Sequence, residues 1–295
     1  MTTTAIQYET ATVRELLERG VQLLQRAQPS DPGATPELDA ELLLARVLGA
    51  NRARLRSHPE EIPGWQAARR FFELIDRRGR GEPIAYILGR KDFWTLELEV
   101  GPAVLVPRPE TELLVERALA LRSEPHARVA DLGTGSGAIA LALASARPGW
   151  QVTATDISPE ALALAAANAS RLGLSRVELV QGDWFDCLAG RSFHLLLSNP
   201  PYIAVDDPAL AQPALMHEPR LALVAAEEGL AALRRILRAA PEHLEPGGWL
   251  LLEHGAGQSA ALAGELVARG FAQVRSHSDL AGCERMTEGQ WPTHP

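Results

Sequence analysis

The residues with the clearest chemical potential form the tetrapeptide Asn199-Pro200-Pro201-Tyr202, which directly follows the apolar run Leu195 to Leu197. Proline fixes φ and has no N–H group, so a double proline cannot continue a β-ladder and instead forms a rigid, extended turn. A substrate NH2 group carries two donors, which the side-chain oxygen of Asn199 and the backbone carbonyl of Pro200 could each accept. With Tyr202 packed on the flat face of the substrate, the tetrapeptide predicts methyl transfer to an amino nitrogen on a planar group. The alternative is a plain proline turn after a strand.

A glycine-rich loop lies upstream, in the segment Asp131-Leu132-Gly133-Thr134-Gly135-Ser136-Gly137. It follows an expected strand and precedes an alanine-rich segment, 138–146, that is typical of a helix. Glycine permits positive φ and a close approach of the backbone to a ligand, so the loop can wrap a bound molecule. The spacing is G-x-G-x-G and departs from the G-x-G-x-x-G pattern of nicotinamide-binding proteins.

Acidic residues end two further expected strands. The alternating segment Val152 to Ala154 leads into Asp156, whose carboxylate can accept hydrogen bonds from ribose hydroxyls, while Ser158 is expected to cap the next helix. Asp183 and Trp184 follow the next apolar segment and could supply a hydrogen-bonding edge and an aromatic wall for an adenine ring. Ordinary core packing is the alternative for Trp184. Because ligands bind at the carboxyl ends of parallel strands, these residues predict one shared pocket.

Together these segments resemble the class I S-adenosylmethionine-dependent methyltransferases, and among them the bacterial release-factor glutamine methyltransferases. The resemblance covers nearly the whole chain. Two segments resemble the release-factor enzymes specifically: Gly81-Glu82-Pro83-Ile84 and Arg108-Pro109-Glu110-Thr111-Glu112. It implies an α/β fold: a Rossmann-like, seven-stranded class I methyltransferase domain with a small N-terminal helical bundle, joined by a β-hairpin. The expected ranges are 1–82 for the bundle, 83–107 for the hairpin or linker and 108–295 for the methyltransferase domain.

The same resemblance implies S-adenosyl-L-methionine as methyl donor and, as acceptor, the glutamine side-chain amide in the Gly-Gly-Gln loop of class 1 peptide release factors. The substrate glutamine would contact Asn199, Pro200, Pro201 and Tyr202, and an aromatic side chain of the Phe93-Trp94 pair, taken here as Phe93, would cover it. The residues expected to contact the cofactor are Gly133, Thr134, Gly135, Ser136, Gly137, Asp156, Trp184 and Asn199, in addition to Asp183.

Bulk composition agrees with this interpretation. The chain has 295 residues, of which 46% are hydrophobic and 22% charged, as expected of a globular protein with up to two domains. A net charge of −8 disfavours a broad nucleic-acid footprint, which normally requires clustered Lys and Arg. The two cysteines form no framework, the histidines show no metal-ligand spacing, and the N-terminus has no basic segment followed by an apolar one. We expect a cytoplasmic protein without a metal, without direct nucleic-acid contact and without a membrane span.

Helix signals dominate the N-terminal part. Thr12 to Glu15 fits a capping box, and Thr35-Pro36 is expected to cap and open a second helix after a loop at 29–33. A third helix is expected over 65–78, with Phe71 facing inward. The resulting bundle could dock a partner or simply shield the catalytic sheet, and the sequence favours neither.

Alternation of apolar residues from Trp94 to Val100 predicts a half-buried hairpin, which would bring Phe93, Arg108, Glu110 and Thr111 towards the cofactor. A plain linker is the alternative. Near the C-terminus we expect a helix at 229–240, a strand at 249–253 and an antiparallel edge pair at 271–275 and 285–289.

The expected reaction is an in-line displacement in which the glutamine nitrogen attacks a sulfonium methyl carbon. Fixed acceptors for both amide hydrogens direct the nitrogen lone pair and stabilise the transition state more than the ground state. Asn199 is neutral and cannot take the proton, so we expect its loss to water. Two alternatives remain: a DNA or ribosomal RNA amino-methyltransferase, which should carry a basic recognition region, and a non-catalytic cofactor-binding scaffold, against which the intact tetrapeptide argues.

Overall fold

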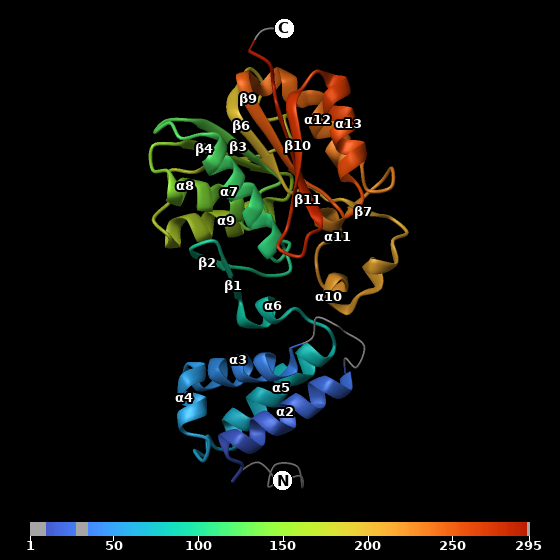
Figure 1. Cartoon of the computed structure of the whole chain (residues 1–295). Coiled ribbons are helices and arrows are strands. Elements are labelled where there is room, and N and C mark those ends of the chain that lie inside the picture. The colour runs from blue at the N-terminus through green and yellow to red at the C-terminus, as the bar shows by residue number, and fades with distance from the viewer. Residues whose placement is uncertain (1–9, 28–34, 294–295) are drawn as a thin grey trace. The chain divides into compact units, whose positions relative to one another are not determined.

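The structure is a computed structural model that describes residues 10–27 and 35–293 (Figure 1). The chain divides into two compact units, one formed by residues 1–89 with 211–217 and the other by residues 90–210 with 218–295. Of the range 83–107 expected for the hairpin or linker, residues 83–89 thus belong to the first unit and residues 90–107 to the second, and a short piece from the middle of the chain belongs to the first. The loop expected at 29–33 lies outside the described residues.

The first unit is helical. The Thr12–Glu15 capping box is confirmed, because the Thr12 amide donates to Glu15 Oε2 at 2.8 Å and the Glu15 amide donates to Thr12 Oγ1 at 3.3 Å. Thr35 precedes its helix as expected but does not cap it, since its hydroxyl donates to Asp39 Oδ1 at 3.1 Å instead. The helices are α2 Val13–Ala27, α3 Pro36–Leu48, α4 Arg52–Ser57, α5 Trp65–Gly79, α6 Ile84–Leu88 and α10 Pro213–Met216.

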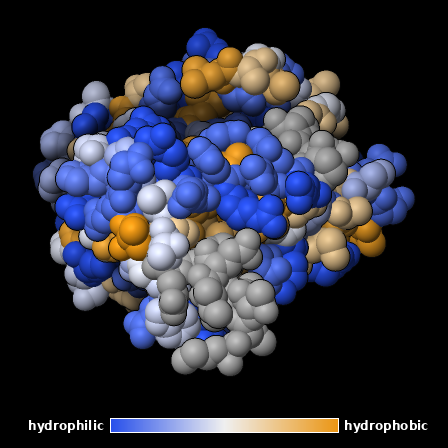
Figure 2. Space-filling model, turned by 90° about the horizontal axis from the view of Figure 1, so that it is seen from below, coloured by the Kyte–Doolittle hydropathy of each residue, from blue (hydrophilic) through white to orange (hydrophobic). Residues whose placement is uncertain are grey.

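The helical unit has its own core, centred on Phe71, Leu16 and Leu43, which are at most 1% exposed. A buried ion pair joins α3 to α5, with Arg78 Nε 2.7 Å from Asp39 Oδ2. The face in Figure 2 is mostly hydrophilic, and its hydrophobic residues lie in small separate groups. Scattered surface hydrophobics of this kind are normal for a folded protein.

The second unit contains a seven-stranded sheet, as the sequence predicted. In the order β5-β4-β3-β6-β9, the strands run parallel, and β11 pairs antiparallel with β9 and β10. The antiparallel pair is confirmed, although β11 lies between β9 and β10, so that only β10 is at an edge. The strands are β3 Arg128–Leu132, β4 Gln151–Asp156, β5 Glu178–Gln181, β6 Phe193–Ser198, β9 Leu244–Glu253, β10 Ala272–Ser278 and β11 Glu284–Gln290.

Helices cover both faces of this sheet (Figure 1). The alternation of side chains along a strand divides the leucines between two cores: Leu195 and Leu197 join one cluster, and Leu196 joins the other. Such strands, buried on both faces, are typical of parallel sheets. The first cluster packs under α7 Glu112–Leu121 and α8 Ala138–Ala146, next to α9 Pro159–Arg171, and the second under α12 Ala231–His243 and α13 Ser259–Arg269.

The expected hairpin is present, with β1 Arg90–Phe93 paired antiparallel to β2 Leu96–Glu99. A second small pair is parallel and joins β7 Ile203–Ala204, just after the tetrapeptide, to β8 Val224–Ala225. Short helical turns complete the unit at η1 Pro109–Thr111, η2 Pro208–Ala211 and α11 Arg220–Leu223. No helix in the described part of the chain combines the length and apolar character needed to cross a bilayer.

Candidate active site

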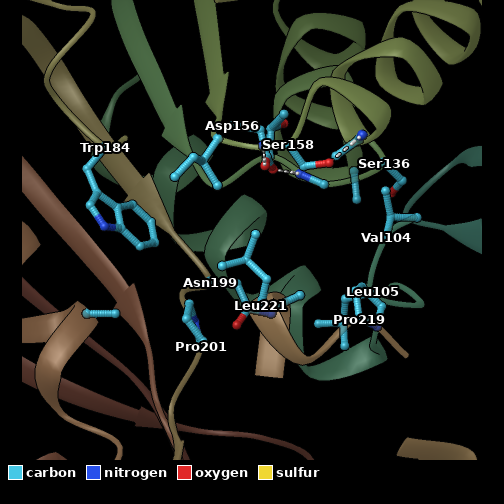
Figure 3. Close-up of a pocket in the computed structure, with 18 of the residues that line it drawn as sticks. Val104, Leu105, Ser136, Asp156, Ser158, Trp184, Asn199, Pro201, Pro219 and Leu221 are labelled. Atoms are coloured by element: carbon cyan, nitrogen blue, oxygen red, sulfur yellow. Dashed lines mark hydrogen bonds between the residues drawn. The ribbon is translucent and has the colours of Figure 1, made fainter. Parts of the chain in front are cut away.

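A cavity of ≈ 460 Å³ lies in the second unit at the carboxyl ends of β3, β4 and β6 (Figure 3). In the sheet, β3 lies between β4 and β6, and the chain continues from β3 to β4. The cavity therefore occupies the point where the strand order reverses, which is a usual ligand site in open α/β sheets. Trp184 lies on one side of it, and Val104 and Leu105 lie on the opposite side. The residues expected from the sequence that line it are Gly133, Thr134, Gly135, Ser136, Asp156, Asp183, Trp184, Asn199 and Pro201.

The glycine loop is held against β4, because the amides of Gly133 and Thr134 both donate to the Thr155 carbonyl at 2.9 Å. Gly135 has a φ of +57° and open space where a Cβ would stand, which leaves its backbone accessible. Gly137 serves packing instead, since a Cβ there would lie 2.9 Å from Leu141 Cδ1 and its absence allows the start of α8 to pack. Gly137 does not line the cavity, contrary to the expectation of a direct ligand contact.

Asp131, at the end of β3, carries an unsatisfied acceptor. Its side chain is fully buried, and Oδ2 accepts from the Thr134 hydroxyl at 2.6 Å and from the Ala140 amide at 3.2 Å. Oδ1 has no hydrogen-bond partner among the described residues, and burial raises the pKa of the carboxyl to about 7. A buried acceptor of this kind beside a glycine loop fits a ligand that brings a donor. In the sequence this acid stands out only as part of the glycine motif, and no separate role was predicted for it.

Asp156, at the end of β4, also holds the glycine loop in place. Its Oδ2 accepts from the Gly135 amide and its Oδ1 from the Ser158 amide, both at 2.9 Å. Ser158 caps α9 as predicted, with its hydroxyl accepting from the Ala161 amide at 3.1 Å. Because each carboxylate oxygen has two lone pairs, Asp156 retains capacity for hydroxyl donors in the cavity.

Trp184 and Asp183 form the wall beside the loop. Trp184 adopts a left-handed backbone conformation, with φ of 55°, and a Cβ on Gly133 would lie only 3.2 Å from its ring. Such strain in a bulky residue is often retained at functional sites. Asp183 Oδ2 is paired with Arg235 Nη1 at 2.6 Å, and Arg235 also lines the cavity. No signal in the sequence pointed to this arginine, which lies on α12.

Asn199 follows β6 directly, and its amide group is fixed on one side. Nδ2 donates to the Thr111 hydroxyl oxygen at 3.0 Å, while no donor among the described residues reaches Oδ1. The Pro200 carbonyl likewise receives no amide from the described chain. Of these two acceptors, only Asn199 belongs to a residue that lines the cavity, because Pro200 is buried; Pro201 lines the cavity as well.

The two aromatic residues expected over the substrate lie elsewhere. Phe93 is 1% exposed and belongs to the core beneath α7, because the alternation that buries one face of the hairpin points this ring inward. Tyr202 packs against the other core, and its hydroxyl donates to Glu253 Oε1 at 3.2 Å. Neither side chain lines the cavity.

Thr111 and Arg108 come from the segment that the hairpin was expected to deliver. Thr111 lines the cavity beside Asn199. Arg108 instead pairs with the buried carboxylate of Glu218 at 2.5 Å, and Glu218 Oε2 also accepts from the Val106 amide at 3.0 Å. This clamp holds the segment before Thr111 in place.

Comparisons with known proteins agree with this geometry. The chain matches the models of the PrmC N-terminal domain over residues 15–89 and of the methyltransferase small domain over residues 109–225. The release factor glutamine methyltransferase of Pseudomonas aeruginosa is 53% identical over 91% of this chain and 97% of its own length. That of Escherichia coli is 43% identical over 87% of this chain and 93% of its own.

Among solved structures, the catalytic domain of hMettl16 matches with a TM-score of 0.57 at 18% identity over 75% of this chain and 81% of its own. A methyltransferase from Pyrococcus furiosus matches with a TM-score of 0.51 at 20% identity over 67% and 89% of the two chains. At this level of identity the structures establish a shared fold.

Proposed function

Because the chain belongs to the release factor glutamine methyltransferase family, we propose that it methylates the glutamine side-chain amide in the Gly-Gly-Gln motif of class 1 peptide release factors. S-adenosyl-L-methionine is the methyl donor that this family and fold imply. The observation that carries the proposal is the free Oδ1 acceptor of Asn199, which lines the cavity and can accept a hydrogen of a primary amide.

The residues of the cavity fit S-adenosyl-L-methionine. The glycine loop leaves room for close approach of a ligand at Gly135, which lines the cavity. Asp156 has acceptor capacity for ribose hydroxyls, and Trp184 offers an aromatic wall for adenine. When bound, S-adenosyl-L-methionine supplies an electrophilic methyl group on a sulfonium.

Asn199 acts on the nucleophile. An amide nitrogen is a weak nucleophile because its lone pair is delocalised into the carbonyl. Asn199 Oδ1 and the Pro200 carbonyl accept the two N–H hydrogens, which fixes the rotation of the amide and favours charge build-up on nitrogen. These contacts strengthen as the nitrogen becomes more acidic, so they stabilise the transition state. Asn199 has no basic group to offer, and the proton leaves to water.

The test is methyl transfer by the Asn199→Ala variant. Loss of one preorganised hydrogen-bond partner lowers kcat by roughly 10²- to 10³-fold. The assay follows a radiolabelled methyl group into purified release factor, with duplex DNA and ribosomal RNA as competing acceptors, and calorimetry measures cofactor binding, which we expect to be retained.

Asn51→Ala is the matched control. Asn51 caps α4 through the Arg54 amide, in the helical unit, so this change costs stability of about 1 kcal/mol without altering the cavity. Turnover of Asn199→Ala close to that of Asn51→Ala would contradict the role of Asn199. Transfer to DNA or RNA in preference to release factor would contradict the substrate.

A further inference from the structure

The side chain of Gln258 connects three backbone segments of the second unit. Gln258 directly precedes α13, at the position where a side chain often caps the helix. Its Oε1 instead accepts from the Gly255 amide at 2.8 Å, and its Nε2 donates to the Tyr202 carbonyl at 3.1 Å and to the Glu228 carbonyl at 3.2 Å. Three separate parts of the chain therefore meet at one carboxamide, and one of them is the last residue of the tetrapeptide that begins at Asn199.

The orientation of the Gln258 carboxamide is fixed by the groups that it meets. A backbone N–H can only donate and a carbonyl oxygen can only accept, so Oε1 must face the Gly255 amide and Nε2 must face the two carbonyls. A half-turn of the carboxamide would break all three hydrogen bonds. Each hydrogen of the NH2 group has its own carbonyl partner, so the side chain can hold Tyr202 and Glu228 at the same time.

The surrounding backbone leaves the space that this side chain needs. A Cβ on Gly255 would lie 3.1 Å from Gln258 Oε1, and a Cβ on Gly229 would lie 2.7 Å from Gln258 Nε2. Glu228 has a φ of 58°, a left-handed conformation that is unfavourable for a residue with a side chain. Such a conformation persists where neighbouring contacts hold it, and the hydrogen bond from Gln258 is one of these contacts.

These contacts hold the tetrapeptide at its carboxyl end. Asn199 directly follows β6, so the sheet holds the amino end. Pro200 and Pro201 lie between the two ends and have a fixed φ, so a movement of one end is passed on to the other. The substrate nitrogen must lie close to Asn199 Oδ1 and in line with the methyl group, and a misplacement of about 1 Å in such an arrangement can slow the reaction on the order of 10²-fold.

We propose that Gln258 is a positioning residue for methyl transfer. By binding the Tyr202 carbonyl, it holds the tetrapeptide in the geometry that presents Asn199 Oδ1 to the substrate amide. As far as the substrate is concerned, the inference rests on the proposed function.

Gln258→Glu tests this role with almost no change of shape. One carboxylate oxygen can still accept from the Gly255 amide, but the other faces two carbonyl oxygens and has no proton to donate. The resulting repulsion displaces the Tyr202 carbonyl, and we expect kcat for methylation of release factor to fall by roughly 10- to 100-fold. The KM values for release factor and S-adenosyl-L-methionine should change little, because Gln258 is not among the described residues that line the cavity. Gln258→Met removes the donors without adding a charge and should lower kcat by a smaller factor, again with little change in KM.

Gln290→Glu is the matched control. Gln290 is also a partly buried glutamine, and its Nε2 donates to the Gly247 carbonyl at 3.0 Å. Gly247 lies near the amino end of β9, which runs parallel to β6, whereas the cavity lies at the carboxyl end of β6. The control should therefore lower stability without changing kcat. Urea unfolding of all variants ensures that kcat is compared between folded proteins.

Carbonyl labelling observes the contact without turnover. The sequence has three tyrosines, Tyr8, Tyr86 and Tyr202, so full-length protein labelled with 13C at the tyrosine carbonyl gives three signals. The Tyr202 signal is assigned by its loss in Tyr202→Phe. We expect it to move in both Gln258 variants, because the carbonyl loses a hydrogen bond, and to stay constant in Gln290→Glu.

A Tyr202 signal that stays constant in both Gln258 variants overturns the proposal. So does a kcat in both variants equal to that of Gln290→Glu, or a loss of activity that lies entirely in KM. A wild-type protein that methylates another acceptor instead of release factor would reject the proposed function, and the same comparison on that acceptor would then decide the role of Gln258.

Discussion

Replacing Gly229 by alanine tests whether the backbone of the tetrapeptide must be held in place. Gly229 follows Glu227 and Glu228 in a run of positive φ values, 55°, 58° and 85°. A Cβ at Gly229 would lie 2.1 Å from the carbonyl oxygen of Tyr202 and 2.7 Å from Gln258 Nε2, which itself donates to that oxygen at 3.1 Å. Both neighbours are packed, so the added methyl group must displace the Tyr202 backbone.

The size of this displacement sets the expected effect. The carbonyl must move by about 1 Å to reach an ordinary contact distance, and a misplacement of about 1 Å at a reacting centre can reduce turnover on the order of 10²-fold. That factor corresponds to about 2.7 kcal/mol of activation free energy. The left-handed backbone adds a cost of about 1–2 kcal/mol to the free energy of unfolding. Cofactor affinity should change little, because Gly229 does not line the cavity.

Gly282→Ala is a control that separates the effect of the steric clash from the effect of the backbone strain. Gly282 has a φ of +80°, close to that of Gly229, but nothing lies within 4 Å of the position of its Cβ, and it is exposed in the turn between β10 and β11. Single-turnover methyl transfer measures the rate of the chemical step, calorimetry measures cofactor Kd, and urea unfolding measures stability. The reasoning fails if folded Gly229→Ala transfers methyl within threefold of Gly282→Ala.

Two further predictions concern the cofactor side of the cavity. Trp184→Ala should weaken binding of S-adenosyl-L-methionine by about 1–2 kcal/mol, or roughly 5- to 30-fold in Kd, because apolar contact is lost. Trp184→Phe should retain most of the affinity. Calorimetry that shows equal Kd values for the alanine variant and the wild type would exclude Trp184 from the binding wall. Burial raises the pKa of Asp131 from its usual 3.8 to about 7, so its neutral form stabilises the fold below about pH 4 and this stability is lost as the pH rises through 7. Asp131→Asn should therefore reduce the fall in unfolding free energy between pH 4 and 8, measured by urea titration at several pH values, and an unchanged slope would show that Asp131 is not neutral in the folded protein.

The sequence predicted the features that depend on nearby residues. The capping box at Thr12, the cap at Ser158 and the helix 138–146 all follow from local hydrogen bonding or periodicity, and the structure contains them. The glycine loop and the tetrapeptide were expected at strand ends, because glycine permits the positive φ of a tight loop and a double proline cannot continue a β-ladder. Both lie there, at one cavity.

Contacts between distant segments could not be predicted in the same way. The Asn199 amide is fixed by Thr111, which is 88 residues away, and Asp183 is paired with Arg235, which is 52 residues away. Alternation in the hairpin correctly predicted that one face is buried, but periodicity does not say what lies beneath that face. The assignment of Phe93 to the substrate came from the family resemblance, and the structure places its ring in the core.

The helical unit also recruits a segment that no local signal assigns to it. Residues 211–217, which contain α10, belong to this unit, and a Cβ on Gly81 would lie 2.3 Å from the Cβ of Pro213. The glycine of the Gly-Glu-Pro-Ile segment thus leaves the space that Pro213 occupies. Gly81 also has a φ of +92°, so both its backbone conformation and the packing of Pro213 favour glycine at this position.

This interleaved connectivity affects how truncations are to be interpreted. A fragment that starts at residue 90 keeps Pro213 but lacks Gly81, on which it packs, and so exposes a surface that is covered in the intact protein. The uncovered stretch lies in the connection between β7 and β8, next to Pro219 and Leu221 of the cavity wall. An inactive fragment would therefore report a disturbed cavity as readily as the loss of a recognition module, and the two halves of this enzyme are not separable at a single cut.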